Sequence, residues 1–343
     1  MNSFFSIIER FAPDAMEIIE TRYQLLRQVM HRQPLGRRQL CKELGYSERL
    51  VRNEVDTLKS QGALIITPAG IVLTDYGEEL LHEIDLLVPA LYHTQTLALK
   101  IKQLFNLQQV IVVPGDSQQD PLIQKDLGRA AARFLEKSLH AGCTVAVTGG
   151  TTLAEMAQAT GEFHFPDVLI VPARGGLGEE MELQAGAIAA KIAKAIGAQY
   201  RLLHIPDNLE ENTAEILKRD SHIQEMVNRI KSSDILIHGV GPAMEMASRR
   251  GLSREELALI HQYRAVGEAL RYYFDKSGNI VYETPGIGLE LDDLRNISTV
   301  IAVAGGRNKA EAIKAVLSNG LEDVLLTDEG AAREIINSNG KDG

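Results

Sequence analysis

The chain has 343 residues, a formal net charge of −10, 45% hydrophobic residues and 24% charged residues. This composition is typical of a folded, soluble protein, and the length favours two domains, or a small one and a large one. No apolar run approaches the roughly 20 residues that a membrane span needs, and the start MNSFFSIIER lacks the basic stretch of a signal peptide. A membrane-spanning or disordered protein is therefore excluded, and a cytoplasmic one is expected.

The two cysteines indicate neither a disulfide nor a metal site. Cys41 and Cys143 lie in separate predicted domains, and neither has a His or Cys nearby at the spacing of metal ligands. Both fit buried thiols of a cytosolic protein. No metal and no cofactor are therefore expected.

Charge is unevenly distributed along the chain. Residues 21–60 carry nine Lys and Arg against four Asp and Glu, a net charge of +5. Residues 61–343 carry 26 basic and 38 acidic residues, a net charge of −12. A basic segment on an acidic protein can bind phosphate locally while the remaining surface repels nucleic acid. This asymmetry favours a nucleic-acid contact within residues 21–60.

After a predicted first helix, the basic segment has the pattern of a helix-turn-helix. Leu40 and Leu44 share one face of a short helix, Gly45 interrupts it, and Ser47 can cap a second helix whose apolar spacing restarts at Leu50. The run GALIITPAGIVLT then predicts two short strands around a Pro-Ala-Gly turn, as in the wing of a winged helix. An ordinary two-helix hairpin is the alternative, but turn, wing and charge together favour DNA binding.

The second helix of this motif is short enough to enter a major groove about 12 Å wide. Arg49, Arg52 and Asn53 point outward in the predicted helix and suit base edges. The other basic residues suit the phosphates. The predicted DNA-binding residues are Arg37, Arg38, Lys42, Ser47, Arg49, Arg52, Asn53 and Lys59.

The segment after the wing is predicted to be helical as far as residue 106, with Pro89 bending or interrupting it. Its apolar residues at 80, 84, 87 and 91 recur at the spacing of a seam between two helices. Either this helix pairs with a partner subunit or it caps the large domain. The expected domains are 1–74 (winged helix-turn-helix), 75–108 (helical linker and candidate dimerisation segment) and 109–343 (effector binding and oligomerisation).

From residue 109 the pattern changes to alternating strands and helices. Solid apolar runs, rather than alternating ones, predict strands covered on both faces, and so a doubly wound, mostly parallel, Rossmann-like α/β sheet. Strands are predicted at 109–115, 143–150, 167–176, 200–206, 234–241, 298–306 and 323–330. Helices are predicted at 121–139, 151–159, 182–197 and 253–263, and a hairpin at 271–283. Ligands of such sheets bind beyond the carboxyl ends of the strands.

Three of these strand ends carry glycines followed by polar or basic residues. Residues 149–152, Gly-Gly-Thr-Thr, and residues 305–309, Gly-Gly-Arg-Asn-Lys, each begin a helix, where free backbone N–H groups can hold an anion. Arg174 ends a third strand, and Arg249 and Arg250 follow a fourth. Two such anion sites and at least four cations predict a ligand with two anionic groups, for which a sugar bisphosphate is the natural candidate. Ordinary tight turns are the alternative reading of the glycines.

Two polar residues and two alternatives complete this prediction. Gln184 and Glu268 could bind hydroxyls between the two anionic groups. Arg174 could instead form an ion pair with Glu179 or Glu180 on the surface. The chain has neither a Walker phosphate loop nor a complete dinucleotide fingerprint.

The rival function is a sugar-phosphate isomerase or deaminase with an added DNA-binding module. Its catalytic base would come from a carboxylate near the strand ends. None of the candidates stands in a recognisable catalytic motif, so a binding protein is favoured over an enzyme. These candidates are Glu179, Glu180, Glu182 and Asp328.

The strings GRRQL, SERLVRNEVDTLKSQG, VAVTGGTT, VPARGGLGE, RYYF, IAVAGG and LLTDEGAA, spread over nearly the whole chain, resemble the SorC family of bacterial transcription regulators. The resemblance implies a repressor of glycolytic genes that binds its operator as a homodimer or homotetramer. It also implies that fructose-1,6-bisphosphate weakens DNA binding through a domain similar to sugar-phosphate isomerases and deaminases. The implied effector contacts are Gly149, Gly150, Thr151, Thr152, Arg174, Gln184, Arg249 or Arg250, Glu268 and Lys309.

Overall fold

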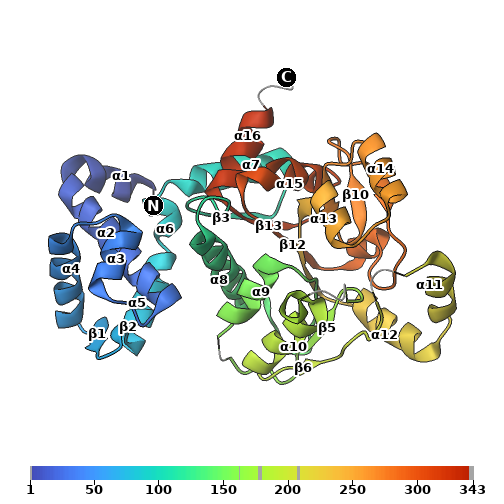
Figure 1. The fold of residues 1–343 in the computed structure, drawn as a ribbon, viewed down its shortest axis with the longest axis horizontal. Helices are drawn as coiled ribbons and strands as arrows, with labels where there is room; N and C mark the ends of the chain where they lie inside the picture. Colours follow the sequence, from blue (N-terminus) through green and yellow to red (C-terminus); the bar gives the residue numbers. More distant parts are fainter. Residues whose placement is uncertain (1, 162, 177–179, 207–208, 340–343) are drawn as a thin grey trace. The chain divides into compact units, whose positions relative to one another are not determined.

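The computed structural model describes residues 2–161, 163–176, 180–206 and 209–339. It divides into two compact units, Met1–Thr94 and Gln95–Gly343, which Figure 1 colours from blue to cyan and from cyan to red. Among the described residues, no helix combines the length and the apolar character that crossing a bilayer requires. The two units are considered separately below.

The first unit contains a helix-turn-helix and a two-stranded wing, as predicted. One buried residue from each of five elements, namely Leu25, Leu40, Val55, Ile71 and Leu81, contributes to its apolar core. The helices and strands of this unit are α1 (Asn2–Phe11), α2 (Pro13–Arg32), α3 (Arg37–Leu44), α4 (Glu48–Ser60), β1 (Leu64–Thr67), β2 (Gly70–Leu73), α5 (Asp75–Asp85) and α6 (Val88–Leu91).

Local residues account for the turn between α3 and α4. Gly45 ends α3 with a φ of 68°, a left-handed conformation that glycine adopts without steric cost. Ser47 caps α4, because its side chain accepts a hydrogen bond from the N–H of Leu50. The wing strands β1 and β2 pair antiparallel, with Thr67 opposite Gly70. The predicted helix-turn-helix and wing are therefore both present.

The helical segment expected after the wing consists of three helices; the break near Pro89 was predicted, and the second break was not. The chain leaves helical structure between α5 and α6, and again before α7 (Thr94–Phe105) at His93, which has a φ of 58°. Pro89 lies in the first turn of α6. Proline fits there, because an N–H at that position has no acceptor within the helix. The break lies in the turn before Pro89, where proline interrupts a helix because it lacks an N–H and crowds the carbonyl four residues earlier, that of Asp85, as predicted.

The expected linker of residues 75–108 is divided between the two units. Leu81 and Val88 are buried in the core of the first unit, and Leu80 and Ile84 pack against that core. Of the apolar residues expected to form a seam, Leu87 is exposed. Helices α5 and α6 thus complete the first unit, while α7 packs in the second.

The second unit is a seven-stranded parallel sheet with helices on both faces, which confirms the predicted fold class (Figure 1). Its order is β3-β13-β12-β7-β4-β5-β6. The strands are β3 (Gln109–Val113), β4 (Thr144–Val147), β5 (Leu169–Pro172), β6 (Gln199–Tyr200), β7 (Ile235–Gly239), β12 (Thr299–Val303) and β13 (Val324–Asp328). The remaining helices are α8 (Pro121–Ser138), α9 (Thr151–Ala159), α10 (Ala185–Ala195), α11 (Glu211–Leu217), α12 (Ser221–Lys231), α13 (Ala243–Arg249), α14 (Arg254–Gln262), α15 (Ala310–Leu317) and α16 (Glu329–Asn339).

Two apolar cores form on the two faces of this sheet. Helices α8, α9 and α10 cover one core, and α7, α12, α15 and α16 contribute to the other. The chain builds β4, β5 and β6 toward one edge, then returns to add β7, β12 and β13 on the other side of β4. The strand order therefore reverses between β4 and β7, and a crevice forms beyond the carboxyl ends of strands at such a point.

The strand predicted at 200–206 is largely absent. Only Gln199 and Tyr200 pair, with Leu169 and Ile170 of β5. Between residue 201 and Pro206, the described chain forms one further strand-like pairing, an isolated bridge between Pro206 and Gly176. This segment lies at the edge of the sheet, where a strand has a neighbour on one side only, so its apolar sequence does not compel further pairing.

The second unit also contains a small antiparallel sheet whose strands pair in the order of the sequence. These strands are β8 (Gly241–Pro242), β9 (Gly267–Ala269), β10 (Tyr272–Phe274) and β11 (Ile280–Glu283). The predicted hairpin corresponds to β10 and β11. The predicted capping box between Ser253 and Glu256 is formed at the start of α14. Because β8 follows β7 almost directly, this small sheet places its residues beside the crevice.

Candidate functional site

Helix α4 presents a polar face opposite its buried one. Val51, Val55 and Leu58 are buried in the core of the first unit. Arg49, Arg52 and Asn53 are exposed on the other side, because residues three and four apart share a helix face. The three residues predicted to contact bases are therefore available to a partner.

The residues predicted to contact phosphates differ in whether they form an ion pair within the protein. Arg38, Lys42 and Lys59 are exposed, and within the part of the chain that the structure describes they make no ion pair. Arg37 instead lies 2.7 Å from a carboxylate oxygen of Asp56, so its charge is partly compensated within the protein. Ser47 serves as the cap of α4.

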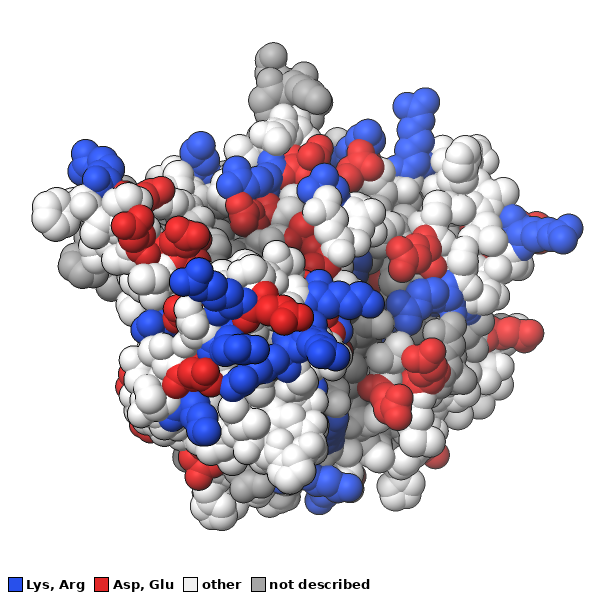
Figure 2. Space-filling model, turned by 60° about the vertical axis from the view of Figure 1, so that its left-hand side comes forward, with Lys and Arg blue, Asp and Glu red and all other residues white. Residues whose placement is uncertain are grey.

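Other basic residues of this unit are paired with acidic ones. Arg22 lies 2.7 Å from Glu54, and Arg32 lies 2.9 Å from Glu43. Lys and Arg side chains nevertheless gather on the face of this unit that Figure 2 turns toward the viewer, with Asp and Glu among them. The exposed residues Arg38, Lys42, Arg49, Arg52 and Lys59 of α3 and α4 thus contribute to the net positive charge of residues 21–60.

The second unit contains a pocket beyond the carboxyl ends of β4, β5, β7 and β12, where the strand order reverses. Its open volume, including the solvent at the mouth, is about 960 Å³. All ten residues that the sequence predicted as effector contacts line this one pocket: Gly149, Gly150, Thr151, Thr152, Arg174, Gln184, Arg249, Arg250, Glu268 and Lys309.

The two positions after β4 require glycine for different structural reasons. A side chain at Gly149 would meet the backbone oxygen of Leu183 at 2.5 Å, so close packing requires glycine there. Gly150 has a φ of 128°, which side chains rarely allow. Its N–H donates to the oxygen of Leu183 at 2.9 Å and is therefore not available to a ligand. The available donors are the N–H groups of the first turn of α9, which have no acceptor within the helix.

The second anion site expected from the sequence, at residues 305–309, is occupied by the protein's own groups, and that prediction was wrong. The N–H of Gly306 donates to Asp328 at 2.6 Å, that of Arg307 to Asp116 at 3.3 Å, and that of Asn308 to the Gln118 side chain at 3.2 Å. The N–H of Lys309 donates to the Gly306 oxygen. This loop therefore offers the pocket the side chain of Lys309 and not a cradle of N–H groups.

Two of the pocket arginines share a buried carboxylate. A guanidinium nitrogen of Arg250 lies 2.6 Å from Oε1 of Glu268, and one of Arg174 lies 3.6 Å from the same oxygen. All three side chains are at most 8% exposed. Glu268 reaches this place because β9 pairs with β8, which puts it opposite Gly241. Arg174 thus has a buried carboxylate, Glu268, as a partner. Glu179, one of the two residues suggested for a surface ion pair with Arg174, lies outside the described residues.

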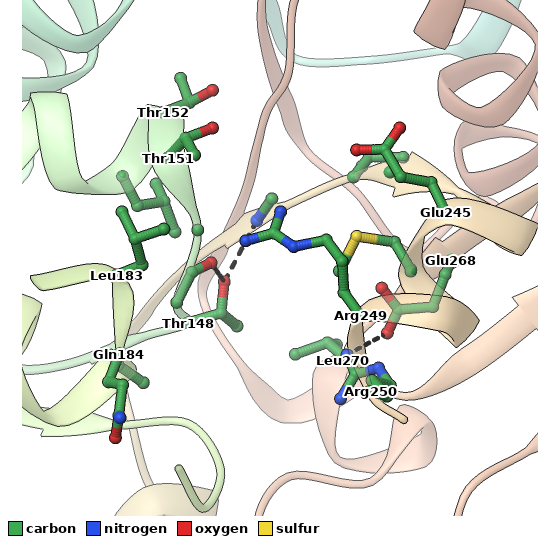
Figure 3. Close-up of a pocket in the computed structure, with 18 of the residues that line it drawn as sticks. Thr148, Thr151, Thr152, Leu183, Gln184, Glu245, Arg249, Arg250, Glu268 and Leu270 are labelled. Carbon is green, nitrogen blue, oxygen red and sulfur yellow. Dashed lines mark hydrogen bonds and ion pairs between the residues drawn. The ribbon is translucent and has the colours of Figure 1, made fainter. Parts of the chain in front are cut away.

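The other two cations form a second group. Arg249, the last residue of α13, extends into the pocket toward Thr148, while Arg250 lies beside Glu268 (Figure 3). Burial lowers the pKa of the Lys309 ammonium, the carboxylate of Glu245 opposes that shift, and the charge of Arg249 adds to it. Lys309 and Arg249 thus line the pocket as a second group of cations, whose charges interact with each other and with Glu245.

Gln184 lines the pocket, but its side chain is turned aside. Its amide points away from Arg249 in Figure 3, and a Cβ on Gly176 would lie 2.6 Å from its Oε1. A ligand contact by this amide would need the side chain to change rotamer.

Sequence reasoning missed several pocket residues. Thr148 accepts a hydrogen bond from the N–H of Gly239 at 3.2 Å and so joins the ends of β4 and β7. Gln124 lies outside the pocket lining but orients a residue within it, because its side chain donates to the Thr151 hydroxyl at 2.7 Å. Glu245 lies four residues before Arg249 on α13, and this spacing was a usable signal because it places both on one helix face.

Two family models match the chain: a CggR N-terminal DNA binding domain over residues 18–88 and a putative sugar-binding domain over residues 90–337. The central glycolytic genes regulators of Priestia megaterium and Bacillus subtilis are 42% and 38% identical to it, over 98% of this chain and 99% of each relative. A putative SorC family transcriptional regulator from Enterococcus faecalis has a TM-score of 0.66 and 39% identity, over 70% of this chain and 99% of that one. The chain belongs to the SorC family of transcription regulators.

The full-length sorbitol operon regulator SorC from Klebsiella pneumoniae shares the fold over 93% of this chain and 98% of that one, with a TM-score of 0.67 and 19% identity. As a SorC-family member, the protein is a DNA-binding transcription regulator with a sugar-binding domain, and not an enzyme. Asp328, one of the suggested catalytic bases, is fully buried and accepts backbone hydrogen bonds. Among the described residues no group of three or more side chains could hold a metal ion.

Proposed function

We propose that the chain represses glycolytic genes and that a phosphorylated sugar, most specifically fructose-1,6-bisphosphate, releases it from its operator. Its first unit would bind the operator through α4 and the wing, and its second unit would bind the sugar. The names of the two relatives from Priestia megaterium and Bacillus subtilis support regulation of glycolytic genes. We further propose that the protein acts as a homodimer or homotetramer, because a symmetric oligomer suits a palindromic operator.

On the DNA side, we propose that Arg49, Arg52 and Asn53 contact base edges in the major groove. Arg38, Lys42 and Lys59 would contact phosphates. Arg37 would also contact a phosphate if its ion pair with Asp56 opens. Support comes from the exposure of these side chains, apart from the half-buried Arg37, on α3 and on the face of α4 opposite its buried one. Arginine and asparagine side chains read bases by paired hydrogen bonds, whereas lysine binds phosphates without regard to sequence.

The observation that carries the effector proposal is the convergence of four cationic residues on one pocket at the strand-order reversal. Arg174 and Arg250 form one pair around Glu268, and Arg249 and Lys309 form the other near Glu245. A ligand with two separated phosphate groups can neutralise both pairs. The N–H groups at the start of α9 add a further contact for one of these phosphates.

The carboxylates in the pocket favour a sugar over a simple dianion. Glu180, Glu245 and Glu268 are hydrogen-bond acceptors in the pocket lining, and sugar hydroxyls can donate to them. A purely anionic ligand would be repelled by the same groups. The mixed lining thus fits hydroxyls placed between two phosphates.

Release from DNA requires that the sugar phosphate bind the weakly DNA-binding arrangement more tightly than the other. Equal affinity for the two arrangements would shift nothing. The effector would therefore act on the arrangement of the protomers and not by competing for the DNA-binding surface.

Isothermal titration calorimetry of the full chain tests the effector proposal. We expect fructose-1,6-bisphosphate to bind at least about tenfold more tightly than fructose 6-phosphate, because the second phosphate gains charge-assisted hydrogen bonds. Inorganic phosphate should bind more weakly than either. Equal affinity for the two sugars would contradict the assignment of two cation pairs to two phosphates, and no binding of either sugar would contradict the effector proposal as a whole.

A further inference from the structure

The loop that carries Lys309 is held in place by two carboxylates from outside the pocket, Asp116 and Asp328. The loop runs from Gly305 to Lys309 between β12 and α15 and includes the single 3-10 turn η3 (Arg307–Lys309). Neither carboxylate lines the pocket. Their arrangement is a feature of this site that the proposed function does not use.

Asp328 joins three segments of the chain. Its Oδ2 accepts hydrogen bonds from the N–H and hydroxyl of Ser117 at 2.8 and 2.6 Å and from the N–H of Gly306 at 2.6 Å. Its Oδ1 accepts one from the N–H of Ala331 at 2.8 Å. The side chain is fully buried. A buried carboxylate with four donors fixes the relative positions of the segments that supply them.

Asp116 holds the same loop from the end of β3. Its Oδ2 lies 2.5 Å from Nε of Arg307, and its Oδ1 accepts from the N–H groups of Gln118 and Arg307 at 3.0 and 3.3 Å. Burial alone would raise the pKa of Asp116, but the hydrogen bonds from Arg307 and Gln118 hold that pKa below its ordinary value. The Arg307 side chain is 55% exposed, so it closes the loop from the solvent side.

The glycines of the loop fit these carboxylates. A Cβ on Gly305 would lie 2.6 Å from Oδ2 of Asp328, so only glycine lets the carboxylate approach. Gly306 has a φ of 101°, a conformation that glycine adopts readily. The Gly-Gly pair is thus explained by contact with an anionic group of the protein itself.

Lys309 depends on this arrangement because it is the loop's contribution to the pocket. Its side chain is long and has many rotamers, so its contact with an anion is strong only if the backbone beneath it is fixed. We infer that Asp116 and Asp328 are positioning residues that hold Lys309 against an anionic group of the effector. This inference rests on the proposed function, since it names how one of the proposed effector contacts is kept in place.

The test is a double-mutant cycle on the full chain, with fructose-1,6-bisphosphate as the probe and isothermal titration calorimetry as the readout. Lys309→Ala should weaken binding about tenfold or more, because it removes a charged contact. Asp116→Asn should weaken it about fivefold, because a loosened loop presents Lys309 less well. In Lys309→Ala protein, adding Asp116→Asn should change the affinity by less than about twofold, since the group it positions is gone.

A second variant and a matched control guard against a general loss of structure. Arg307→Gln acts on the exposed partner of Asp116 and should lower affinity about twofold to threefold, again only when Lys309 is present. The control is Asp234→Asn. The Asp234 carboxylate accepts a hydrogen bond from the N–H of Thr144 at 2.8 Å, at the opposite, amino end of the same sheet. We expect this variant to keep the wild-type affinity within about twofold.

The outcomes separate the inference from the function on which it rests. If the wild type binds the sugar and the effects of Asp116→Asn and Lys309→Ala multiply in the double variant, Asp116 does not act through Lys309 and the inference is overturned. Equal losses in Asp116→Asn and Asp234→Asn would overturn it as well, because they would reflect stability alone. If the wild type does not bind the sugar, the proposed function fails and the inference with it.

Discussion

The DNA-binding helix and the effector pocket both rely on cationic side chains, but they hold them in opposite ways. Around α4, Arg49, Arg52 and Lys59 are exposed to water. In the pocket, Arg174 and Arg250 are buried and share Glu268. Solvent stabilises the exposed charges when no DNA is present, whereas a buried charge needs a partner within the protein. The exposed cations can thus be changed with little effect on folding, and the buried ones cannot.

Breaking the buried pair should have the largest effect. Arg250→Ala leaves Glu268 in a buried site without its 2.6 Å partner, and we expect the free energy of unfolding of the second unit to fall by about 3 kcal/mol. Hydrogen exchange in increasing urea, resolved by peptide, measures this for each unit separately. The matched control is Arg38→Ala, an exposed cation of the first unit, which should change stability by less than about 0.5 kcal/mol. Similar losses in the two variants would erase the contrast between the two regions.

Removing an exposed cation should instead change function. Arg52→Ala should lower operator affinity about tenfold and relax the preference at one base position. The affinity for fructose-1,6-bisphosphate should stay unchanged, which calorimetry on the same preparation checks. Fluorescence anisotropy with labelled operator DNA gives the affinity. An unchanged affinity together with an unchanged sequence preference would remove Arg52 from the proposed reading face.

The cap of α4 allows a smaller and more selective change. Ser47→Ala removes the hydrogen bond that Ser47 accepts from the N–H of Leu50 and should destabilise the first unit by about 1 kcal/mol. Ser47→Gly should lose only a few tenths of that, since glycine is tolerated at this position. If both variants lose operator affinity equally while their stabilities differ, Ser47 contacts DNA in addition to capping the helix.

A pH dependence of stability should arise in the second unit. His238 and Glu322 are buried, with Nε2 of the histidine 3.7 Å from a carboxylate oxygen of the glutamate. Burial lowers the pKa of His238 to about 4 and raises the pKa of Glu322 to about 8. The folded state therefore keeps a proton on Glu322 that the unfolded chain releases above about pH 4.5, and it excludes from His238 a proton that the unfolded chain takes up below about pH 6.5.

Between about pH 4.5 and 6.5, the two groups change the free energy of unfolding in opposite directions as the pH rises. Above about pH 6.5, only Glu322 contributes to the pH dependence. The second unit should thus lose stability as the pH rises from 6.5 toward 8, and Glu322→Gln should reduce this loss. Calorimetric melting across this range measures it, with each kcal/mol worth about 2–4 °C in a unit of this size. The control is Glu225→Gln, which changes an exposed carboxyl of α12. The expectation fails if Glu322→Gln and Glu225→Gln retain the same slope as the wild type.

Much of the fold followed from the sequence because its strongest patterns are local. The apolar runs gave the strands of the parallel sheet, and the Gly45 break with the Ser47 cap gave the helix-turn-helix. The prediction failed where the tertiary surroundings of a segment, and not its local sequence, determine its secondary structure. The apolar segment 200–206 lies at a sheet edge and mostly does not pair, and the segment after the wing has a second break, at His93, that the sequence did not indicate.

The pocket could be predicted because strand ends in a parallel sheet meet at one edge, so residues such as Arg174 and Lys309 converge although they are far apart in sequence. The partners of these residues could not. Glu268 meets Arg250 through the pairing of β9 with β8, and Asp116 meets Arg307 across 191 positions of the chain. The glycines at 305 and 306 resembled those of a phosphate-binding loop, because a loop that surrounds a carboxylate of the protein itself has the same pattern of glycines.

The most direct test of the account is the operator affinity of the full chain measured with and without saturating fructose-1,6-bisphosphate. Anisotropy with labelled operator DNA, at one salt concentration throughout, gives both values. The account predicts that the sugar lowers operator affinity at least about tenfold and that Lys309→Ala protein needs a higher sugar concentration for the same loss. An operator affinity that stays the same with and without the sugar, in a protein that calorimetry shows to bind it, would contradict the account.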